Sequence, residues 1–255
     1  MSSRVMIAGL IFGLGLHGTC AQADPWTLGA GIGRYQYSEP QLGVHQSAWL
    51  PSLEASGPLL TVLEGAVTAR VQVTSGQVDY NGSGRMNNQD LQALEVEVKS
   101  PNWWAIWGWD IQILGGYRQL SNDGRGLTST GHIGYRRSSE YLYSGLSLSK
   151  NLPHGVTLTA DALPLFVGRQ TTHMSDIGGE FNGIAAVRNL QKYGLGGRLQ
   201  ICKTFHPFDL CSGLRYWWVG NSDTRLVMTS QSQYLATEPR NNTQTIDVHI
   251  KYRWE

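Results

Sequence analysis

Ionisable side chains recur at every second position in several stretches of the chain. In one of them Glu95, Glu97 and Lys99 alternate with Leu94 and Val96. Successive side chains of a β-strand leave opposite faces, so this spacing gathers charge on one face and leaves the other face apolar. Such a face can pair opposite charges, line an aqueous passage, or supply the carboxylates of a catalytic pair.

If these strands enclose a narrow lumen, the same alternation predicts which charged side chains point into it. Both signs are well represented, so two interpretations stay open. The charges can pair across the lumen and close it, or they can form charged rings in a small, weakly selective pore. The predicted inward set is Glu54, Glu64, Arg70, Glu95, Glu97, Lys99, Asp110, Arg118, Asp161, Arg198, Arg215, Asp247, His249, Lys251 and Arg253.

Two groups of residues could support catalysis. His173 and Asp176, together with Asp110, could activate water in the manner of the omptin proteases, but the surrounding residues do not match the omptin motifs. Ser129 and His132 could imitate the nucleophile and base of a lipid A deacylase, but no third, orienting residue is evident. We therefore expect no catalytic site. The histidines lack the paired spacing of a metal site, so neither a metal nor another cofactor is expected.

Two cysteines flank the predicted His206-Pro207 turn. By the alternation of their strands, Cys202 and Cys211 both point inward. A disulfide across this hairpin is sterically plausible in an oxidising compartment. Two free thiols that act as small hydrophobic residues are the alternative, and the spacing does not suit a redox-active pair.

The elements that would position these residues are clearest at the C-terminus. Ile246, Val248 and Ile250 fall on one face of the last strand and are followed there by the aromatic residues Tyr252 and Trp254. Aromatic residues at the end of an apolar strand face are typical of the interfacial girdle of a membrane barrel. The end also resembles the aromatic C-terminal assembly signal of outer-membrane proteins, although one more residue, a glutamate, follows the final aromatic side chain.

Composition fits the same class of protein. The chain has 31 glycines, 10% aromatic residues and 15% charged residues, compared with roughly 25% charged residues in ordinary soluble domains. Twenty basic residues nearly balance nineteen acidic ones, and no basic tract suggests a nucleic-acid partner. No stretch after the N-terminal segment is long enough for a transmembrane helix, so a helical membrane protein is excluded.

The N-terminal segment has the layout of a secretory signal peptide. Arg4 precedes an apolar run over 5–16, and a small-residue stretch ends at Ala23. We predict a signal peptide over 1–23, cleaved before Asp24, and a single domain over 24–255. A membrane anchor would need roughly 20 apolar residues, and the residues before Cys20 do not resemble a lipid-attachment site.

Turn signals divide the rest of the chain into about ten strands, which predicts an all-β, transmembrane, antiparallel up-and-down β-barrel. Short periplasmic turns are expected near 57–58, 101–102, 152–155 and 206–207, and long extracellular loops over 38–46, 81–90, 121–139, 170–189 and 222–241. The predicted strands are 25–37, 47–56, 62–80, 90–100, 104–120, 139–150, 155–169, 190–205, 209–221 and 242–254. An even count places both termini in the periplasm.

The strand ends also carry short motifs that together resemble a family of small bacterial outer-membrane β-barrel proteins. The resemblance spans nearly all of 24–255 and implies the fold and the compartment, but it brings no catalytic residues. The motifs are Tyr37-Ser38-Glu39-Pro40, the segments 76–84 and 115–123, Glu140-Tyr141-Leu142-Tyr143, the segment 193–198, Leu214-Arg215-Tyr216-Trp217-Trp218 and the segment 238–243.

Expected partners follow from the compartment: membrane lipids, lipopolysaccharide and, during biogenesis, the barrel-assembly machinery. Oligomeric state is left open. A passive role, either structural or as a narrow porin-like channel, is the preferred interpretation. Surface recognition is the alternative, because the loops carry basic side chains that could bind phosphates of lipopolysaccharide or another surface ligand, namely Arg125, Arg136, Arg137, Arg188 and Arg225.

Overall fold

The structure is a computed structural model, and it describes residues 25–62, 65–102, 104–184 and 186–254. The predicted signal peptide over 1–23, including Cys20, lies outside the described residues, as does Glu64. Across the described residues, no helix is long and apolar enough to cross a membrane.

Strands make up nearly all of the described secondary structure. They are β1 (Trp26–Glu39), β2 (Val44–Val62), β3 (Gly65–Asn81), β4 (Arg85–Lys99), β5 (Trp104–Ile106), β6 (Trp109–Leu127), β7 (Ile133–Leu152), β8 (Val156–Thr172), β9 (Val187–Gln191), β10 (Gly194–Phe205), β11 (Phe208–Val219), β12 (Thr224–Met228), β13 (Gln233–Thr237) and β14 (Asn241–Trp254). Short 3-10 helices cover η1 (Pro153–Gly155), η2 (Met174–Ile177) and η3 (Gly179–Phe181).

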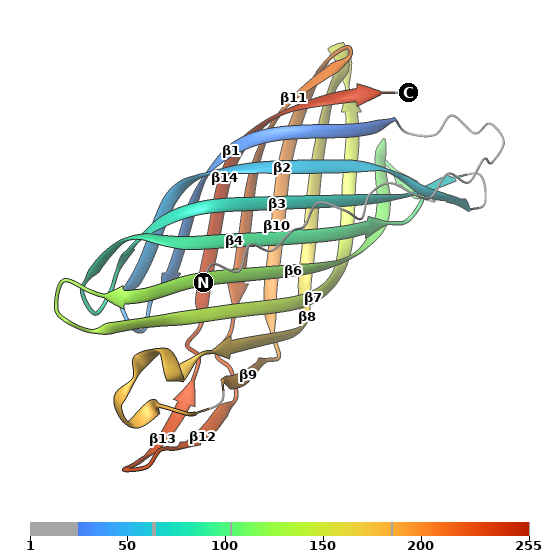
Figure 1. Cartoon of the computed structure of the whole chain (residues 1–255). Coiled ribbons are helices and arrows are strands. Elements are labelled where there is room, and N and C mark those ends of the chain that lie inside the picture. Colours follow the sequence, from blue (N-terminus) through green and yellow to red (C-terminus); the bar gives the residue numbers. More distant parts are fainter. Residues whose placement is uncertain (1–24, 63–64, 103, 185, 255) are drawn as a thin grey trace.

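Ten strands close into an antiparallel barrel, which confirms the predicted fold (Figure 1). The ring runs β1-β2-β3-β4-β6-β7-β8-β10-β11-β14 and returns to β1, because β1 pairs with both β2 and β14. β5 pairs with β6 just beyond the end of β4, and β9 pairs with β8 just beyond the end of β10. β5 therefore continues the place of β4 in the wall and β9 continues that of β10, and neither adds a further strand to the ring.

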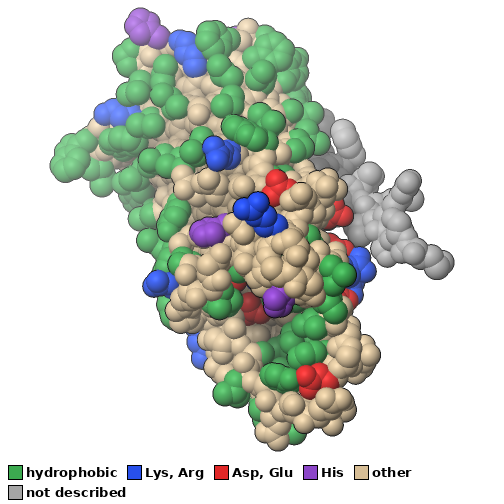
Figure 2. All heavy atoms as spheres, turned by 90° about the vertical axis from the view of Figure 1, so that its left-hand side faces the viewer, with side chains coloured by type: hydrophobic (Ala, Val, Ile, Leu, Met, Phe, Trp, Pro, Cys, Tyr) green, Lys and Arg blue, Asp and Glu red, His purple; other side chains and the backbone are tan. Residues whose placement is uncertain are grey.

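The alternation predicted for the wall strands is confirmed. On β14, Ile246, Val248 and Ile250 are exposed on the outside, while Asp247 and His249 are buried inside. The same contrast between apolar outward and polar inward side chains recurs on β1, β3 and β10. Apolar side chains consequently cover much of one end of the outer surface, as Figure 2 shows in its upper part.

The two ends of the barrel differ in their connections. At one end the links are short: β10 to β11 crosses only His206-Pro207, and β7 to β8 crosses η1. At the other end lie the segments 173–186 and 220–240, of which the second contains the β12–β13 hairpin (Figure 1). Short turns mark the periplasmic end of such barrels, so we assign the long segments to the outside of the cell. Trp26 pairs with Trp254, which places both ends of the wall at the periplasmic end.

Three of the predicted long loops are wrong. Only residues 40–43 separate β1 from β2, 82–84 separate β3 from β4, and 128–132 separate β6 from β7. The polar stretches around these turns are extended and remain paired, so the strands continue beyond the apolar belt. At these strand ends both faces carry polar side chains, so the apolar–polar alternation that marks a strand is missing. Such a stretch resembles a loop in sequence.

The predicted turn at Gly57-Pro58 is also wrong. β2 runs through both residues, which face Ala69 and Thr68 of β3, and the register shifts between Pro58 and Leu60. The missing side chain of Gly57 leaves room for the Trp26 ring, against which a Cβ would collide. The glycine allows close packing, and the proline lies where the hydrogen-bond ladder between the two strands is irregular. Glycine and proline are also typical of turns, so the sequence alone suggests a turn here.

A further tight turn lies inside the predicted strand 104–120. Trp107 and Gly108 both have positive φ, at 53° and 73°, and they link β5 to β6. The predicted break at Pro101-Asn102 is an irregular connection between β4 and β5. Positive φ at two consecutive residues is the signature of a type I′ hairpin turn, which glycine favours.

Candidate functional site

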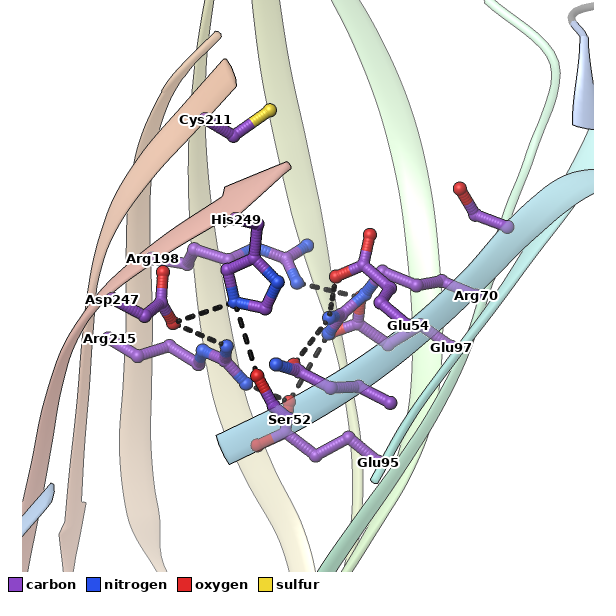
Figure 3. Close-up of polar contacts among 12 residues, drawn as sticks. Ser52, Glu54, Arg70, Glu95, Glu97, Arg198, Cys211, Arg215, Asp247 and His249 are labelled. Carbon is purple, nitrogen blue, oxygen red and sulfur yellow. Dashed lines mark hydrogen bonds and ion pairs between the residues drawn. The ribbon is translucent and has the colours of Figure 1, made fainter. Parts of the chain in front are cut away.

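The lumen at mid-height holds a cluster of buried ion pairs, whose inward orientation is set by the strand alternation (Figure 3). Arg70 on β3 is its most connected member. Its Nε lies 2.8 Å from Glu97, and its two Nη atoms lie 3.2 Å from Glu54 and 3.2 Å from Glu95. It also donates a hydrogen bond to Gln72 over 2.9 Å. One guanidinium thus joins carboxylates from the neighbouring strands β2 and β4.

Two arginines extend the cluster across the lumen. Arg198 on β10 lies 2.9 Å from Glu97, and Arg215 on β11 lies 2.7 Å from Glu95. β4 and β11 are five places apart in either direction around the ring, so these contacts span the barrel interior. Arg215 also contacts Asp247 of β14 over 2.9 Å. Side chains from both walls therefore meet in the middle.

Further cations complete the cluster. Lys251 lies 2.5 Å from Glu54, and Arg118 lies 3.4 Å from Glu95. The guanidinium of Arg118 also sits 5.1 Å from the centre of the Trp217 ring, within range of a cation–π interaction. These contacts tie β6 and β14 to carboxylates of β2 and β4.

Asp161 on β8 closes the remaining side. It accepts a 2.5 Å hydrogen bond from Nε of Arg198, and the Lys99 ammonium lies 3.7 Å away. Lys99 also donates to Ser147 over 2.8 Å. We call the set Glu54, Arg70, Glu95, Glu97, Lys99, Arg118, Asp161, Arg198, Arg215, Asp247 and Lys251 the lumen network.

An apolar cluster packs against the lumen network. Tyr143 and Trp217 meet edge to face with ring centres 5.0 Å apart, and the Tyr143 hydroxyl donates to Glu97 over 2.9 Å. Leu114 and Leu163 pack with them, and all are almost fully buried. A second buried cluster, which includes Tyr35 and the leucines at 50 and 91, lies on β1, β2 and β4. Ion pairs and buried rings therefore lie against each other inside the barrel.

Hollows lie on either side of this filled section. The periplasmic one, about 520 Å³, is lined by lumen-network residues and by Asp110 and Arg253. The extracellular one, about 370 Å³, is lined by residues near the strand tips, among them Leu42, Met86 and Arg137. A hollow of about 30 Å³ is lined in part by Glu95, Arg118, Arg215 and Asp247 of the lumen network.

Of the predicted inward residues, most lie in the lumen network. Asp110 instead lines the periplasmic hollow, and Arg253 pairs with Asp209 over 2.5 Å near the periplasmic end. The sequence interpretation did not single out Asp209, although it occupies an inward position by the same alternation.

Ser52, Asp247 and His249 lie close together in the lumen, a grouping that sequence reasoning missed (Figure 3). Ser52 Oγ is 3.5 Å and Asp247 Oδ2 is 3.7 Å from the same nitrogen, Nε2 of His249. A nucleophile–base–acid triad needs the serine and the carboxylate on opposite ring nitrogens. The arrangement is therefore that of a buried packing contact, and His249 is only 2% exposed.

The first loop group proposed for catalysis is not assembled. Asp176 accepts two 2.9 Å hydrogen bonds from the guanidinium of Arg136, and these bonds hold the pKa of its carboxyl below the usual value. His173 lies near it at the extracellular end, whereas Asp110 lines the periplasmic hollow. The carboxylate thus serves an ion pair that fastens the 173–186 segment to β7.

The second loop group is not assembled either. Ser129 Oγ accepts a 3.0 Å hydrogen bond from the backbone N–H of Arg85, while Nδ1 of His132 lies 3.0 Å from the hydroxyl of Thr130. These contacts hold the 128–132 turn against the tip of β4. Along the described segments, His, Cys, Asp and Glu do not gather in groups of three or more that could hold a metal ion.

The cysteine pair forms the disulfide that the sequence allowed. Cys202 and Cys211 are directly opposite each other on β10 and β11, with an S–S distance of 2.10 Å. The bond links the hairpin whose turn is His206-Pro207, at the periplasmic end.

Most of the loop arginines are engaged within the protein. Arg125 pairs with Asp123, Arg136 with Asp176, Arg137 with Glu39 and Arg225 with Asp223. Of the five loop arginines named in the sequence analysis, Arg188, which is exposed on β9, is the one without an ion pair to another described residue.

Comparisons with known proteins identify the architecture. No protein-family model matches the chain, and no curated protein matches it. Among solved structures, the outer-membrane protease OmpT of Escherichia coli matches with a TM-score of 0.52 at 10% identity, covering 91% of this chain and 96% of OmpT. The translocator domain of the autotransporter NalP from Neisseria meningitidis matches with a TM-score of 0.47 at 13% identity, covering 94% of this chain and 91% of that domain. The β domain of the Bordetella autotransporter BrkA matches with a TM-score of 0.43 at 14% identity, covering 91% and 99%.

At such identity the OmpT likeness shows the fold alone. A closed barrel with apolar side chains on its outside and polar ones within is the form in which strands can span a bilayer, because every backbone group is paired within the wall. The protein is an outer-membrane β-barrel.

Proposed function

We propose that this protein is a passive, integral barrel of the outer membrane whose lumen is closed by its own ion pairs. The observation that carries the proposal is the pair of contacts across the barrel, Arg198 to Glu97 and Arg215 to Glu95. They leave no ring of free charges facing an open passage at this height. The role we assign is structural, and the porin-like channel is the alternative that an experiment must exclude.

Burial supports this choice. Glu97 is 1% exposed, and the carboxylates of Glu54 and Glu95 are almost as well covered. Side chains that line an aqueous pore remain hydrated, whereas these carboxylates are satisfied by guanidinium groups. The rings of Tyr143 and Trp217 add an apolar layer that solutes would have to cross. The proposal also assigns no catalytic step to the protein.

Release of a small solute from liposomes tests the proposal. Vesicles that contain the refolded mature barrel are expected to retain a trapped disaccharide as well as protein-free vesicles do. A double variant, Arg198→Ala with Arg215→Ala, removes the cross-lumen contacts and is expected to release it faster. Rapid release from vesicles with the wild-type barrel would instead establish a pore.

A second candidate function, recognition of a small ligand at the extracellular end, is favoured by the extracellular hollow. Its floor holds the Arg137–Glu39 ion pair and the amides of Gln46 and Gln89, which are hydrogen-bonded over 3.0 Å. Its rim is apolar, with Leu42 62% exposed. A volume of about 370 Å³ suits a small amphipathic molecule.

Saturation-transfer NMR with a library of small neutral amphiphiles, performed on the detergent-solubilised barrel, tests this second function. Molecules that bind wild type are expected to lose their signal in a Gln46→Trp variant, which fills the hollow. Equal signals from both proteins would show that the molecules bind detergent or the outer wall.

A further inference from the structure

The outer wall of the barrel changes from apolar to polar along one line across neighbouring strands. On β1 the outward positions are apolar up to Ile32, and the next outward residue is Arg34. Pairing places Arg34 beside Ile246 of β14 and Trp49 of β2, both well exposed. Figure 2 shows hydrophobic side chains gathered in the upper part of one face of the molecule and mainly polar ones below them. Arg34 therefore marks the upper edge of the apolar belt on this side.

Immediately beyond that edge lies a group of uncharged polar side chains, which we call the outer polar patch. Its members are Gln36, Ser38, His45, Ser47, Asn242 and Gln244, on β1, β2 and β14. They form two rows, because Gln36 faces Ser47 and Gln244, and Ser38 faces His45 and Asn242. The rows border a hollow of about 400 Å³ on the barrel wall.

The chemistry of the outer polar patch suits sugar hydroxyls. Amides and hydroxyls donate and accept hydrogen bonds without demanding a charged ligand. Tyr216, at the edge of the patch and 44% exposed, donates a 3.1 Å hydrogen bond to Asn242 Oδ1, which orients that amide and leaves a ring face beside the hollow. The six patch residues include no carboxylate, and the carboxylate beside them, that of Asp79 on β3, faces Ser47 at the edge of the patch.

Arg34 adds a cation one row below the patch, roughly 7 Å away along the strand. No ion pair is recorded for it within the described ranges, in contrast to the paired arginines of the loops. A guanidinium at the edge of the apolar belt is placed to bind a phosphate of a lipid whose acyl chains lie against Ile246 and Trp49.

We propose that this face of β14, β1 and β2 binds lipopolysaccharide of the outer leaflet, with a lipid A phosphate on Arg34 and the inner-core sugars in the outer polar patch. The occupant follows from the order of chemistries along the wall. Apolar surface, then a cation, then neutral hydrogen-bonding groups match acyl chains, phosphate and sugars in the same order. This binding is independent of whether the lumen is closed.

Native mass spectrometry of the detergent-solubilised mature barrel, titrated with two probes, tests the assignment. The probes are lipid A alone and rough-type lipopolysaccharide, which carries the inner-core sugars. A Gln36→Ala/Gln244→Ala variant is expected to bind the rough-type molecule about tenfold more weakly and lipid A as wild type does. Arg34→Ala is expected to weaken both probes.

The matched control is Gln92→Ala, which removes an exposed amide from β4, away from the patch. Slower gel migration after boiling verifies that each variant is folded. Unchanged binding of the rough-type molecule by the double glutamine variant would overturn the sugar assignment. Equal binding of a free dextran oligosaccharide by wild type would overturn the assignment to a membrane-anchored glycolipid.

Discussion

Glu97 is the carboxylate on which the two halves of the lumen network depend. It accepts from Arg70 on an adjacent strand, from Arg198 across the lumen, and from the hydroxyl of Tyr143. A carboxylate buried to this degree is tolerable only because several donors replace the water that it has lost. The guanidinium groups of Arg70 and Arg198 depend on Glu97 in turn, because both use it as a counter-ion.

Replacement of Glu97 by alanine is expected to lower the free energy of unfolding by about 3–5 kcal/mol, because it leaves buried guanidinium groups without a counter-ion. Urea titration of the barrel in lipid vesicles measures the change. Glu140→Ala is the control: Glu140 also pairs with an arginine, Arg169, but that pair is largely exposed. The control is expected to cost at most about 1 kcal/mol. Equal losses in the two variants would contradict a buried network.

Asp176 provides a pH-dependent contact at the extracellular end. Its hydrogen bonds from Arg136 lower the pKa of the carboxyl below the usual 3.8. The contact therefore stabilises the fold fully above about pH 4 and is lost as the pH falls through the lowered pKa of the folded state. Limited proteolysis of the 173–186 segment with an acid-active protease is expected to accelerate at the lowest pH values.

Asp176→Asn supplies the comparison for that experiment. It is expected to be cleaved rapidly already at pH 6, and to show little further change on acidification. A wild-type cleavage rate that is constant down to pH 2 would show that the Arg136 contact does not hold the segment.

At the scale of the elements, close approach of neighbouring strands depends on particular glycines. A Cβ on Gly145 of β7 would collide with the backbone oxygen of Ala162 on β8, which can move only if the strand moves. Gly145→Ala is therefore expected to cost about 1–3 kcal/mol in urea unfolding. Gly115→Ala on β6 is the matched control, because the nearest atom to its Cβ would be a carbonyl oxygen 4.0 Å away. A control as damaging as the test variant would refute this steric explanation.

The disulfide stabilises the β10–β11 hairpin by restricting the unfolded chain. For a bridge between residues nine positions apart, loss of the cross-link is expected to cost about 2–3 kcal/mol. Unfolding of wild type with and without a reducing agent, beside a Cys202→Ser/Cys211→Ser variant, measures this contribution. The double variant should be insensitive to the reducing agent; a wild type that is equally insensitive would mean that the bond does not form.

The wall strands were predictable because apolar and polar residues alternate over many consecutive positions in each strand of a membrane barrel. Ile246 to Trp254 illustrates this, since apolar and polar side chains alternate along the whole strand. Strand limits were harder to predict. Gly57-Pro58 has turn composition but lies within β2, and the Trp107-Gly108 turn interrupts a stretch that alternates on both sides. Local composition indicates which residues can form a turn. Whether they do so depends on their pairing with the neighbouring strand.

At the scale of the whole molecule, alternation predicts which side chains enter the lumen, but not which of them meet. Arg198 and Glu97 are 101 residues apart in sequence, and their contact depends on how far each strand is shifted against the next around the ring. Ser52 of β2 and His249 of β14 lie close together because both face Gly31 of β1, the strand between them. Only the closed barrel supplies that information, which is why the choice between a filled lumen and a pore stayed open at the level of sequence.

The lumen network lies between two hollows, one toward the periplasmic end and one toward the extracellular end. We expect this arrangement to keep a membrane-spanning barrel with polar groups inside from conducting ions. It also directs the search for ligands to the extracellular hollow and to the outer wall.

Single-channel recording in a planar bilayer tests the closed lumen most directly. After heat-dependent gel migration has verified folding, the wild-type barrel is expected to insert without conductance steps, while the variant that combines Arg198→Ala and Arg215→Ala is expected to produce them. Discrete, repeatable steps from the wild-type protein would contradict the account and establish a pore through the lumen network.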